Sequence, residues 1–230
     1  MSKTIAIMGI SGSGKSSSIR TLDPETTFYI DADGKGLTWK GWKDQYNAKK
    51  GNYYKTNYPQ MVEKWLLWLN GKQRDEKGNL VDAAKKDGLK FKVVIIDTLN
   101  ALMIAEEQRQ MKNKGYDKWA DLAANIWNIL ELALTLRDDL TVVFTAHTET
   151  VSDDNGIVET HVATSGRKLR KMVPESKINT VLLAEINDNG EHVFVTKRQN
   201  TTAKEGFIGA FETVEMPNDL AEVIKKLEEF

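Results

Sequence analysis

Short apolar runs alternate with amphipathic stretches along most of the chain. The clearest runs are residues 3–8, 26–31, 91–97 and 140–146, each of strand length and rich in β-branched or aromatic residues. Apolar runs with little polar interruption are typical of strands buried on both faces of a parallel sheet. The pattern therefore predicts an α/β fold with a mainly parallel sheet.

Amphipathic stretches between and after these runs have the spacing of helices that cover such a sheet. The first is short, because Pro24 follows it closely and proline cannot continue a helix. The predicted helices are residues 16–22, 58–69, 99–109, 119–136 and 217–230.

The Asn-Gly pairs at residues 155–156 and 189–190 mark tight turns, which this dipeptide strongly favours. The pair at residues 189–190 joins residues 180–186 to residues 192–196, which predicts an antiparallel hairpin at one side of the sheet. The pair at residues 155–156 predicts a loop or hairpin over residues 148–164, followed by a short basic helix at residues 167–172.

Residues 34–90 form an elaborated connection within one predicted domain that spans residues 1–230. Residues 71–88 of this connection are polar and flanked by glycines, which favours a short hairpin or a loop. We identify no internal repeat and no inter-domain linker.

Composition narrows the function classes. The chain has 230 residues, of which 40% are hydrophobic and 28% charged, as in soluble globular proteins. We find no apolar run near the roughly 20 residues of a membrane helix and no signal peptide, so we expect a cytoplasmic protein without a membrane partner. The absence of cysteine excludes disulfides and thiolate metal sites, and the three histidines lack zinc-ligand spacing. We therefore expect metal to enter only with a nucleotide.

The segment after the first predicted strand carries the most specific motif. Residues 9–16 read Gly-Ile-Ser-Gly-Ser-Gly-Lys-Ser, the pattern of a phosphate-binding loop. Its glycines let backbone N–H groups converge on phosphate oxygens, and the helix that follows adds partial positive charge. The predicted residues for binding ATP are Gly9, Ile10, Ser11, Gly12, Ser13, Gly14, Lys15, Ser16 and Ser17.

Three side chains complete the predicted phosphate and Mg²⁺ site. Lys15 is expected to reach the β and γ phosphates, and Ser16 to give its hydroxyl to Mg²⁺. Asp97 ends a buried strand, where a P-loop protein places the carboxylate that holds Mg²⁺ through water. Thr98 follows it, where many ATPases place a water-activating acidic residue. This argues against ABC-type and AAA-type machines and for a carboxylate on another strand.

With these motifs the chain resembles the RecA-like recombinase core. More closely, it resembles short phage RecA-like proteins of the Sak type, described as AAA-type ATPases and linked to single-strand annealing recombination. The resemblance covers nearly the whole chain. Besides the phosphate loop it rests on four short segments in the family's order, at residues 29–33, 95–98, 144–147 and 164–169.

The resemblance implies further catalytic residues. Asp33 matches the glutamate that positions the attacking water, but its arm is about 1.5 Å shorter, and a misplacement of that size can cost about 10²-fold in rate. His147 matches the residue that reports the γ-phosphate to the DNA-binding loop. The family also completes its site with cations from a neighbouring subunit, for which the candidates are Lys197, Arg198 and Lys204.

The resemblance also places two loops toward DNA, and both are basic here. Residues 35–64 add lysines interleaved with six aromatic residues, which are ingredients of single-strand binding. The net charge of −1 gives no global attraction to nucleic acid, so such binding depends on local clusters. The predicted DNA-binding residues are Lys112, Lys114, Tyr116, Lys118, Arg167, Lys168, Arg170 and Lys171.

The sequence leaves three functions open. The first is a homo-oligomeric, slowly hydrolysing ATPase that binds single-stranded DNA and promotes annealing or strand exchange, with a single-strand-binding protein as a further partner. The second is a small-molecule P-loop kinase, which the scarcity of clustered arginines weakens because only Arg167 and Arg170 lie close together. The third is a nucleotide-dependent switch with little hydrolysis.

Overall fold

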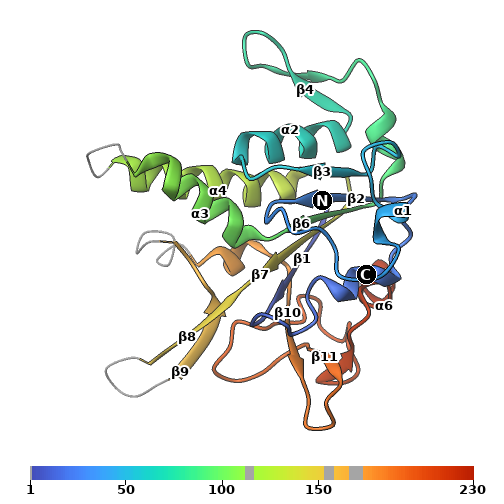
Figure 1. Ribbon diagram of the computed structural model, residues 1–230, viewed down its shortest axis with the longest axis vertical. Helices are drawn as coiled ribbons and strands as arrows, with labels where there is room; N and C mark the ends of the chain where they lie inside the picture. The colour runs from blue at the N-terminus through green and yellow to red at the C-terminus, as the bar shows by residue number, and fades with distance from the viewer. Residues whose placement is uncertain (1, 112–116, 153–157, 166–172) are drawn as a thin grey trace.

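An eight-stranded sheet forms the centre of the computed structural model, which describes residues 2–111, 117–152, 158–165 and 173–230, with the backbone alone for residues 117–120 (Figure 1). Its strand order is β12-β11-β10-β1-β7-β6-β2-β3. The strands are β1 Lys3–Met8, β2 Thr27–Asp31, β3 Tyr53–Lys55, β6 Val93–Asp97, β7 Thr141–Ala146, β10 Thr180–Ile186, β11 His192–Val195 and β12 Glu215–Pro217.

Neighbouring strands from β10 to β3 run parallel, and β11 and β12 add two antiparallel strands at one side. This confirms the predicted α/β fold with an antiparallel hairpin beside a mainly parallel sheet. β1 lies between β10 and β7, with Met8 opposite both Leu183 and Ala146. The segments that follow β1, β6 and β7 therefore leave the sheet at the same edge.

Alternate residues of each strand face opposite layers, as the two-residue period of a strand requires. Phe28 and Ile30 pack in the cluster under α2 Pro59–Leu69, α3 Leu99–Gln110 and α4 Asp117–Thr135. Tyr29 faces the opposite cluster, which contains the buried side of α6 Leu220–Glu228. In Figure 1 the three long helices lie on one side of the sheet and α6 on the other.

The helix after the phosphate loop differs from its prediction. It is a five-residue 3₁₀ helix, η1 Ser17–Thr21, rather than an α-helix over residues 16–22. The hydroxyls of Ser17, Ser18 and Thr21 each donate to the carbonyl three residues earlier, which competes with α-helical backbone bonding. A helix this short contributes less dipole to the phosphate site than we expected from the sequence.

The predicted connection 34–90 contains α1 Trp42–Gln45, β3, α2, the hairpin of β4 Lys72–Arg74 with β5 Leu80–Asp82, and η2 Asp87–Lys90. A second hairpin, β8 Thr148–Ser152 with β9 Val158–Val162, follows β7 and extends away from the sheet (Figure 1). Both hairpins agree with the sequence patterns. η3 Pro174–Lys177 precedes β10. The basic helix predicted at residues 167–172 lies outside the described residues.

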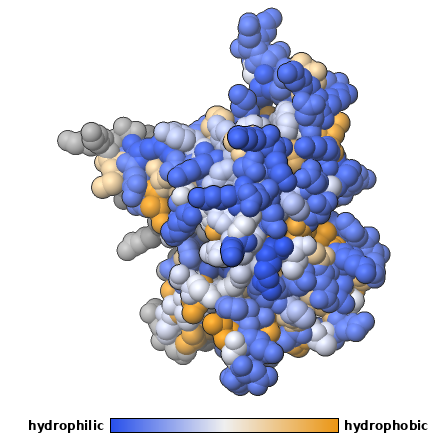
Figure 2. Space-filling view, turned by 45° about the vertical axis from the view of Figure 1, so that its right-hand side comes forward, coloured by the Kyte–Doolittle hydropathy of each residue, from blue (hydrophilic) through white to orange (hydrophobic). Residues whose placement is uncertain are grey.

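The surface is mainly hydrophilic on the face that Figure 2 shows, with hydrophobic side chains in small separate groups. Across the described part of the chain, no helix combines the length and the apolar character needed to cross a membrane.

Candidate nucleotide site

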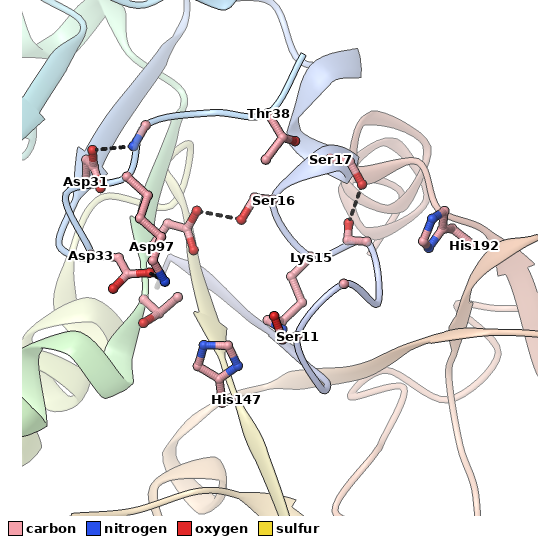
Figure 3. Close-up of a pocket in the computed structure, with 15 residues that line it drawn as sticks. Ser11, Lys15, Ser16, Ser17, Asp31, Asp33, Thr38, Asp97, His147 and His192 are labelled. Carbon is pink, nitrogen blue, oxygen red and sulfur yellow. Dashed lines mark hydrogen bonds and ion pairs between the residues drawn. The ribbon is translucent and has the colours of Figure 1, made fainter.

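A cavity of about 400 Å³ opens at the edge of the sheet where β1, β6 and β7 end. The phosphate loop forms one wall of this cavity (Figure 3). Asp33 and Asp97 lie on one side of the loop, and His192 lies on the other. The cavity is thus at the carboxyl ends of parallel strands, where open α/β sheets bind ligands.

The conformation of the phosphate loop depends on its glycines. Gly12 has φ +81° and Gly14 has φ +101°, a region that other residues rarely adopt. A Cβ on Gly9 would lie 2.5 Å from the carbonyl oxygen of Ala184. Glycine is therefore required at these positions for the bend of the loop and for its close approach to β10, which fits a cradle for phosphates.

Lys15 folds back across the loop. Its Nζ donates to the carbonyl oxygens of Gly9 at 2.8 Å and Ile10 at 2.7 Å. Burial lowers the pKa of Lys15 to about 8; Asp97 opposes this shift and Lys35 adds to it. A phosphate group would supply the negative charge that this buried ammonium lacks.

Asp97 is a buried carboxylate of the cavity, with only 5% of the residue exposed. Its Oδ2 accepts hydrogen bonds from the hydroxyls of Ser16 at 2.8 Å and Tyr29 at 2.7 Å, and its Oδ1 accepts one from Thr145. Burial and the Asp97 charge raise the pKa of Tyr29, so this phenol stays a donor. The structure thus brings together the two residues predicted to hold Mg²⁺.

The residues present fit a nucleotide with Mg²⁺. Ser16 and Asp97 offer a hydroxyl and a carboxylate oxygen within reach of each other, and oxygen donors suit Mg²⁺. The glycine cradle and Lys15 lie beside them in the same cavity. Together these groups would hold a Mg²⁺–triphosphate.

The two aspartates after β2 have different surroundings. Asp31 is buried and accepts from the N–H groups of Gly34 at 2.6 Å and Gly36 at 2.9 Å, and from the Tyr53 hydroxyl at 2.6 Å. It therefore holds the loop that follows β2. Asp33 lines the cavity, and its side chain, about a third exposed, lies 2.5 Å from Lys35 Nζ.

His147 lines the cavity at the end of β7, where its backbone is fixed by a residue that sequence reasoning missed. Asn100 Oδ1 accepts from the His147 N–H at 2.6 Å, and Asn100 Nδ2 donates to the Ala163 carbonyl at 2.6 Å. The Ala163 N–H donates to the His147 carbonyl at 2.8 Å. Asn100 thus ties both ends of the β8–β9 hairpin to the start of α3.

Burial lowers the pKa of the His147 imidazole, and the nearby Lys15 ammonium adds to this effect. The ring is therefore mainly neutral at pH 7, with one nitrogen as donor and the other as acceptor. The only sequence signal for Asn100 was a polar residue at a buried position of the first turn after Asp97.

The three cations expected to act across a subunit boundary follow β11 and line none of this cavity. Arg198 forms a two-pronged ion pair with Glu185, with both N···O distances at 2.6 Å. Lys204 Nζ donates to the Glu175 carbonyl at 3.0 Å, and burial lowers its pKa. Lys197 is the most exposed of the three and lies 3.8 Å from Glu205. Their role in trans stays a prediction.

The predicted DNA-binding side chains all lie outside the described part of the structure, and for Lys118 the backbone alone is described, in α4. This applies to Lys112, Lys114, Tyr116, Lys118, Arg167, Lys168, Arg170 and Lys171.

Most aromatic residues within 35–64 pack, partly buried, against the protein's core, and Tyr46 is fully buried. Tyr53 stacks on Tyr29 with ring centroids 5.8 Å apart, and Tyr54 packs on Trp65 at 4.7 Å. Tyr58 is 52% exposed, and the Arg109 guanidinium covers its ring at 3.7 Å. These rings therefore stabilise the connection, and a role as a stacking platform for bases is not supported for most of them.

Comparison with known proteins adds one match. The profile of a family described as an AAA domain matches residues 1–206, which include the phosphate loop, Asp33, Asp97 and His147. The match ends before β12 and α6. A search of curated proteins finds no match.

This match corrects the exclusion of AAA-type machines that we drew from Thr98. The Thr98 side chain has another task, since its Oγ1 accepts from the Ala101 N–H at 3.2 Å and caps the start of α3. The residue after Asp97 is therefore used to begin the helix, and its identity does not exclude the family.

Proposed function

The chain belongs to the AAA domain family that its residues 1–206 match, which implies ATP binding and hydrolysis, and we propose that the protein couples ATP hydrolysis to the binding of single-stranded DNA. The protein would bind a single strand and promote annealing or strand exchange, as the RecA-like proteins it resembles do. It would act as a homo-oligomer, with Mg²⁺ as the metal.

The contact between Ser16 and Asp97 carries the nucleotide part of the proposal. The Ser16 hydroxyl lies 2.8 Å from Asp97 Oδ2, directly after Lys15. Ser16 and Asp97 would hold Mg²⁺, which when bound neutralises charge on the phosphates. Lys15 would leave the carbonyls of Gly9 and Ile10 and donate to the phosphates instead.

Hydrolysis needs a group that orients water at the terminal phosphate. Asp33 is the candidate because it lines the cavity beside Lys35 and near Asp97. Its Oδ2 lies 2.5 Å from Lys35 Nζ, so we expect slow hydrolysis until Lys35 is drawn away. DNA-stimulated turnover would follow if assembly on a strand moves Lys35.

The DNA part of the proposal is supported by the β8–β9 hairpin. It starts directly after His147, extends from the nucleotide edge, and is tied to α3 by Asn100 (Figure 1). Nucleotide binding at this edge could therefore alter the position of the hairpin. The basic residues of segments 112–118 and 167–171 would contact the strand's phosphates.

The ion pair between Asp33 and Lys35 also favours a second candidate function. With the Asp33 carboxylate directed at Lys35 Nζ and not at a water, the protein would bind ATP, change shape and hydrolyse little. Such a switch would have the same site and would differ in turnover alone.

Binding and turnover can be tested together. ATP affinity and phosphate release would be measured with Mg²⁺, with and without a single-stranded oligonucleotide, for the wild type and Lys15→Ala. We expect ATP binding in the wild type alone and faster release with the oligonucleotide. Binding without release would favour the switch, and absence of ATP binding in the wild type would refute both functions.

A further inference from the structure

Asn218 connects the C-terminal segment to the phosphate loop. It lies between β12 and α6, beyond the residues that the AAA profile matches. In the antiparallel register of β11 and β12, Val193 pairs with Pro217, so His192 and Asn218 are the next opposed residues. Both side chains come against the same glycine of the loop.

That glycine is Gly14. A Cβ built on it would lie 3.0 Å from Asn218 Nδ2 and 3.0 Å from His192 Nδ1. The segment also contacts the helix that follows the loop, since the Ala221 N–H donates to Thr21 Oγ1 at 3.3 Å and Leu220 packs in the cluster of Ile19. The C-terminal segment therefore touches both the phosphate loop and η1.

The Asn218 carboxamide lacks hydrogen bonds although it is buried. The residue is 5% exposed, and neither Nδ2 nor Oδ1 has a partner among residues 2–111, 117–152, 158–165 and 173–230. Buried polar groups without partners are rare in folded proteins because burial removes their bonds to water. The Asn218 side chain thus holds a donor and an acceptor against the phosphate loop, and neither forms a hydrogen bond with the described residues.

The loop can supply the missing partner. Turning the Ser13–Gly14 peptide changes ψ of Ser13 and φ of Gly14, and glycine adopts either sign of φ at little cost. Gly14 now has φ +101°, and Ser13 Oγ is a second buried atom without a partner among the described residues. Phosphate oxygens attract backbone N–H groups, so a bound phosphate favours rotation of this peptide. The rotation points the Gly14 N–H toward the phosphate and the Ser13 carbonyl away from it.

We propose that Asn218 is a positioning residue of the phosphate loop, whose carboxamide bonds to the loop backbone in the nucleotide-bound form. The inference rests on the proposed ATP binding. Because the bond forms with nucleotide, ATP tightens the docking of residues 215–230, and their docking in turn raises ATP affinity. The chain's own C-terminal segment thereby regulates its phosphate loop.

The test separates this role from a structural one. Asn218→Leu keeps the branched shape and the number of side-chain heavy atoms, and it removes both polar atoms, which are unbonded before nucleotide binds. The ligand-free Tm should therefore stay equal or rise, while ATP–Mg²⁺ affinity falls about tenfold, the loss of about one hydrogen bond. Asn189→Leu, on the exposed turn between β10 and β11, is the matched control and should keep wild-type affinity.

Three outcomes would overturn the inference: wild-type ATP affinity in Asn218→Leu, a ligand-free Tm lowered by several degrees, or equal losses in Asn189→Leu. Hydrogen exchange of residues 215–230 in the wild type gives a second test without a variant. Exchange should slow when ATP and Mg²⁺ are added, and unchanged exchange at saturating ATP would also overturn it. A wild type that binds no ATP would instead refute the proposed function.

Discussion

The hydroxyl of Ser16 donates to Asp97 Oδ2 at 2.8 Å and so joins the phosphate loop to the end of β6 across 81 positions of sequence. Tyr29 donates to the same oxygen at 2.7 Å from the neighbouring strand β2. Because Ser16 and Tyr29 both donate to Asp97 Oδ2, removing the carboxylate can be compared with removing one of its donors. The comparison separates the effect of Asp97 on Mg²⁺ binding from its effect on the fold.

Asp97→Ala should abolish Mg²⁺-dependent hydrolysis, with a loss of at least about 10²-fold, because the carboxylate that holds the metal is removed. Tyr29→Phe removes one donor to the same carboxylate and should lower turnover far less. Phosphate release at increasing Mg²⁺ would measure both. Equal losses in the two variants would contradict the metal role of Asp97.

ATP affinity should depend on the protonation of Lys15. Burial sets the pKa of this lysine at about 8 in the free protein, and phosphate charge raises it in the complex. Below that pKa the lysine is charged before binding; above it a proton must be taken up, so affinity falls about tenfold per pH unit. Calorimetry in buffers of different ionisation enthalpy would detect this proton uptake.

Lys15→Arg is the control for that pH dependence, since a guanidinium stays charged throughout the range. If the variant binds ATP, its affinity should be level between about pH 7 and about pH 9.5. A level profile for the wild type over the same range would contradict the assignment of Lys15 as the group that titrates.

Asn100→Ala should release the base of the β8–β9 hairpin. It leaves the His147 N–H and the Ala163 carbonyl without their side-chain partner, which we expect to cost about 1–3 kcal/mol of unfolding free energy. Urea denaturation would measure this loss. Asn100→Asp keeps the acceptor for His147 but places a buried carboxylate oxygen against the Ala163 carbonyl, so at neutral pH it should lose at least as much. Wild-type stability in both variants would contradict the role of Asn100.

Variants of Arg198 and Glu185 distinguish a role of Arg198 at a neighbouring site from a structural role of its ion pair with Glu185. If Arg198 acts on the site of a neighbouring subunit, Arg198→Ala should lower hydrolysis while ATP affinity stays unchanged. Glu185→Ala frees the arginine from its ion pair and should maintain or raise turnover. Turnover would be measured against protein concentration, and an equal loss in both variants would assign the ion pair to stability alone.

The sequence predicted those parts of the fold that rest on local patterns. Strands β1, β2, β6 and β7 are apolar runs long enough to be recognised alone, and the phosphate loop is defined by its glycine spacing. β3 and β12 have three residues each and exist through pairing with longer neighbours, so no local pattern marks them. The 3₁₀ form of η1 likewise depends on hydroxyl contacts that helical periodicity does not register.

The sequence indicated which residues lie together at the candidate site where a motif fixes them, and it missed those that are placed by distant partners. Asp97 ends an apolar strand, and its carboxylate meets Ser16 as we expected from the sequence. Asn100 acts through His147 and Ala163, 47 and 63 positions away, and Asn218 lies against Gly14 through strand pairing. Asp31 and Asp33 look alike in sequence, and only the buried contacts of Asp31 separate them.

Phosphate release from ATP, with and without single-stranded oligonucleotide at about 50 mM and about 200 mM salt, tests the central claim most directly. The wild type should release phosphate with Mg²⁺, faster with the oligonucleotide at low salt, and lose most of that stimulation at higher salt because phosphate contacts weaken. Lys15→Ala should release none. If the oligonucleotide does not change phosphate release at low salt, the proposed DNA role is contradicted. If Lys15→Ala releases phosphate, the assignment of the nucleotide site is contradicted.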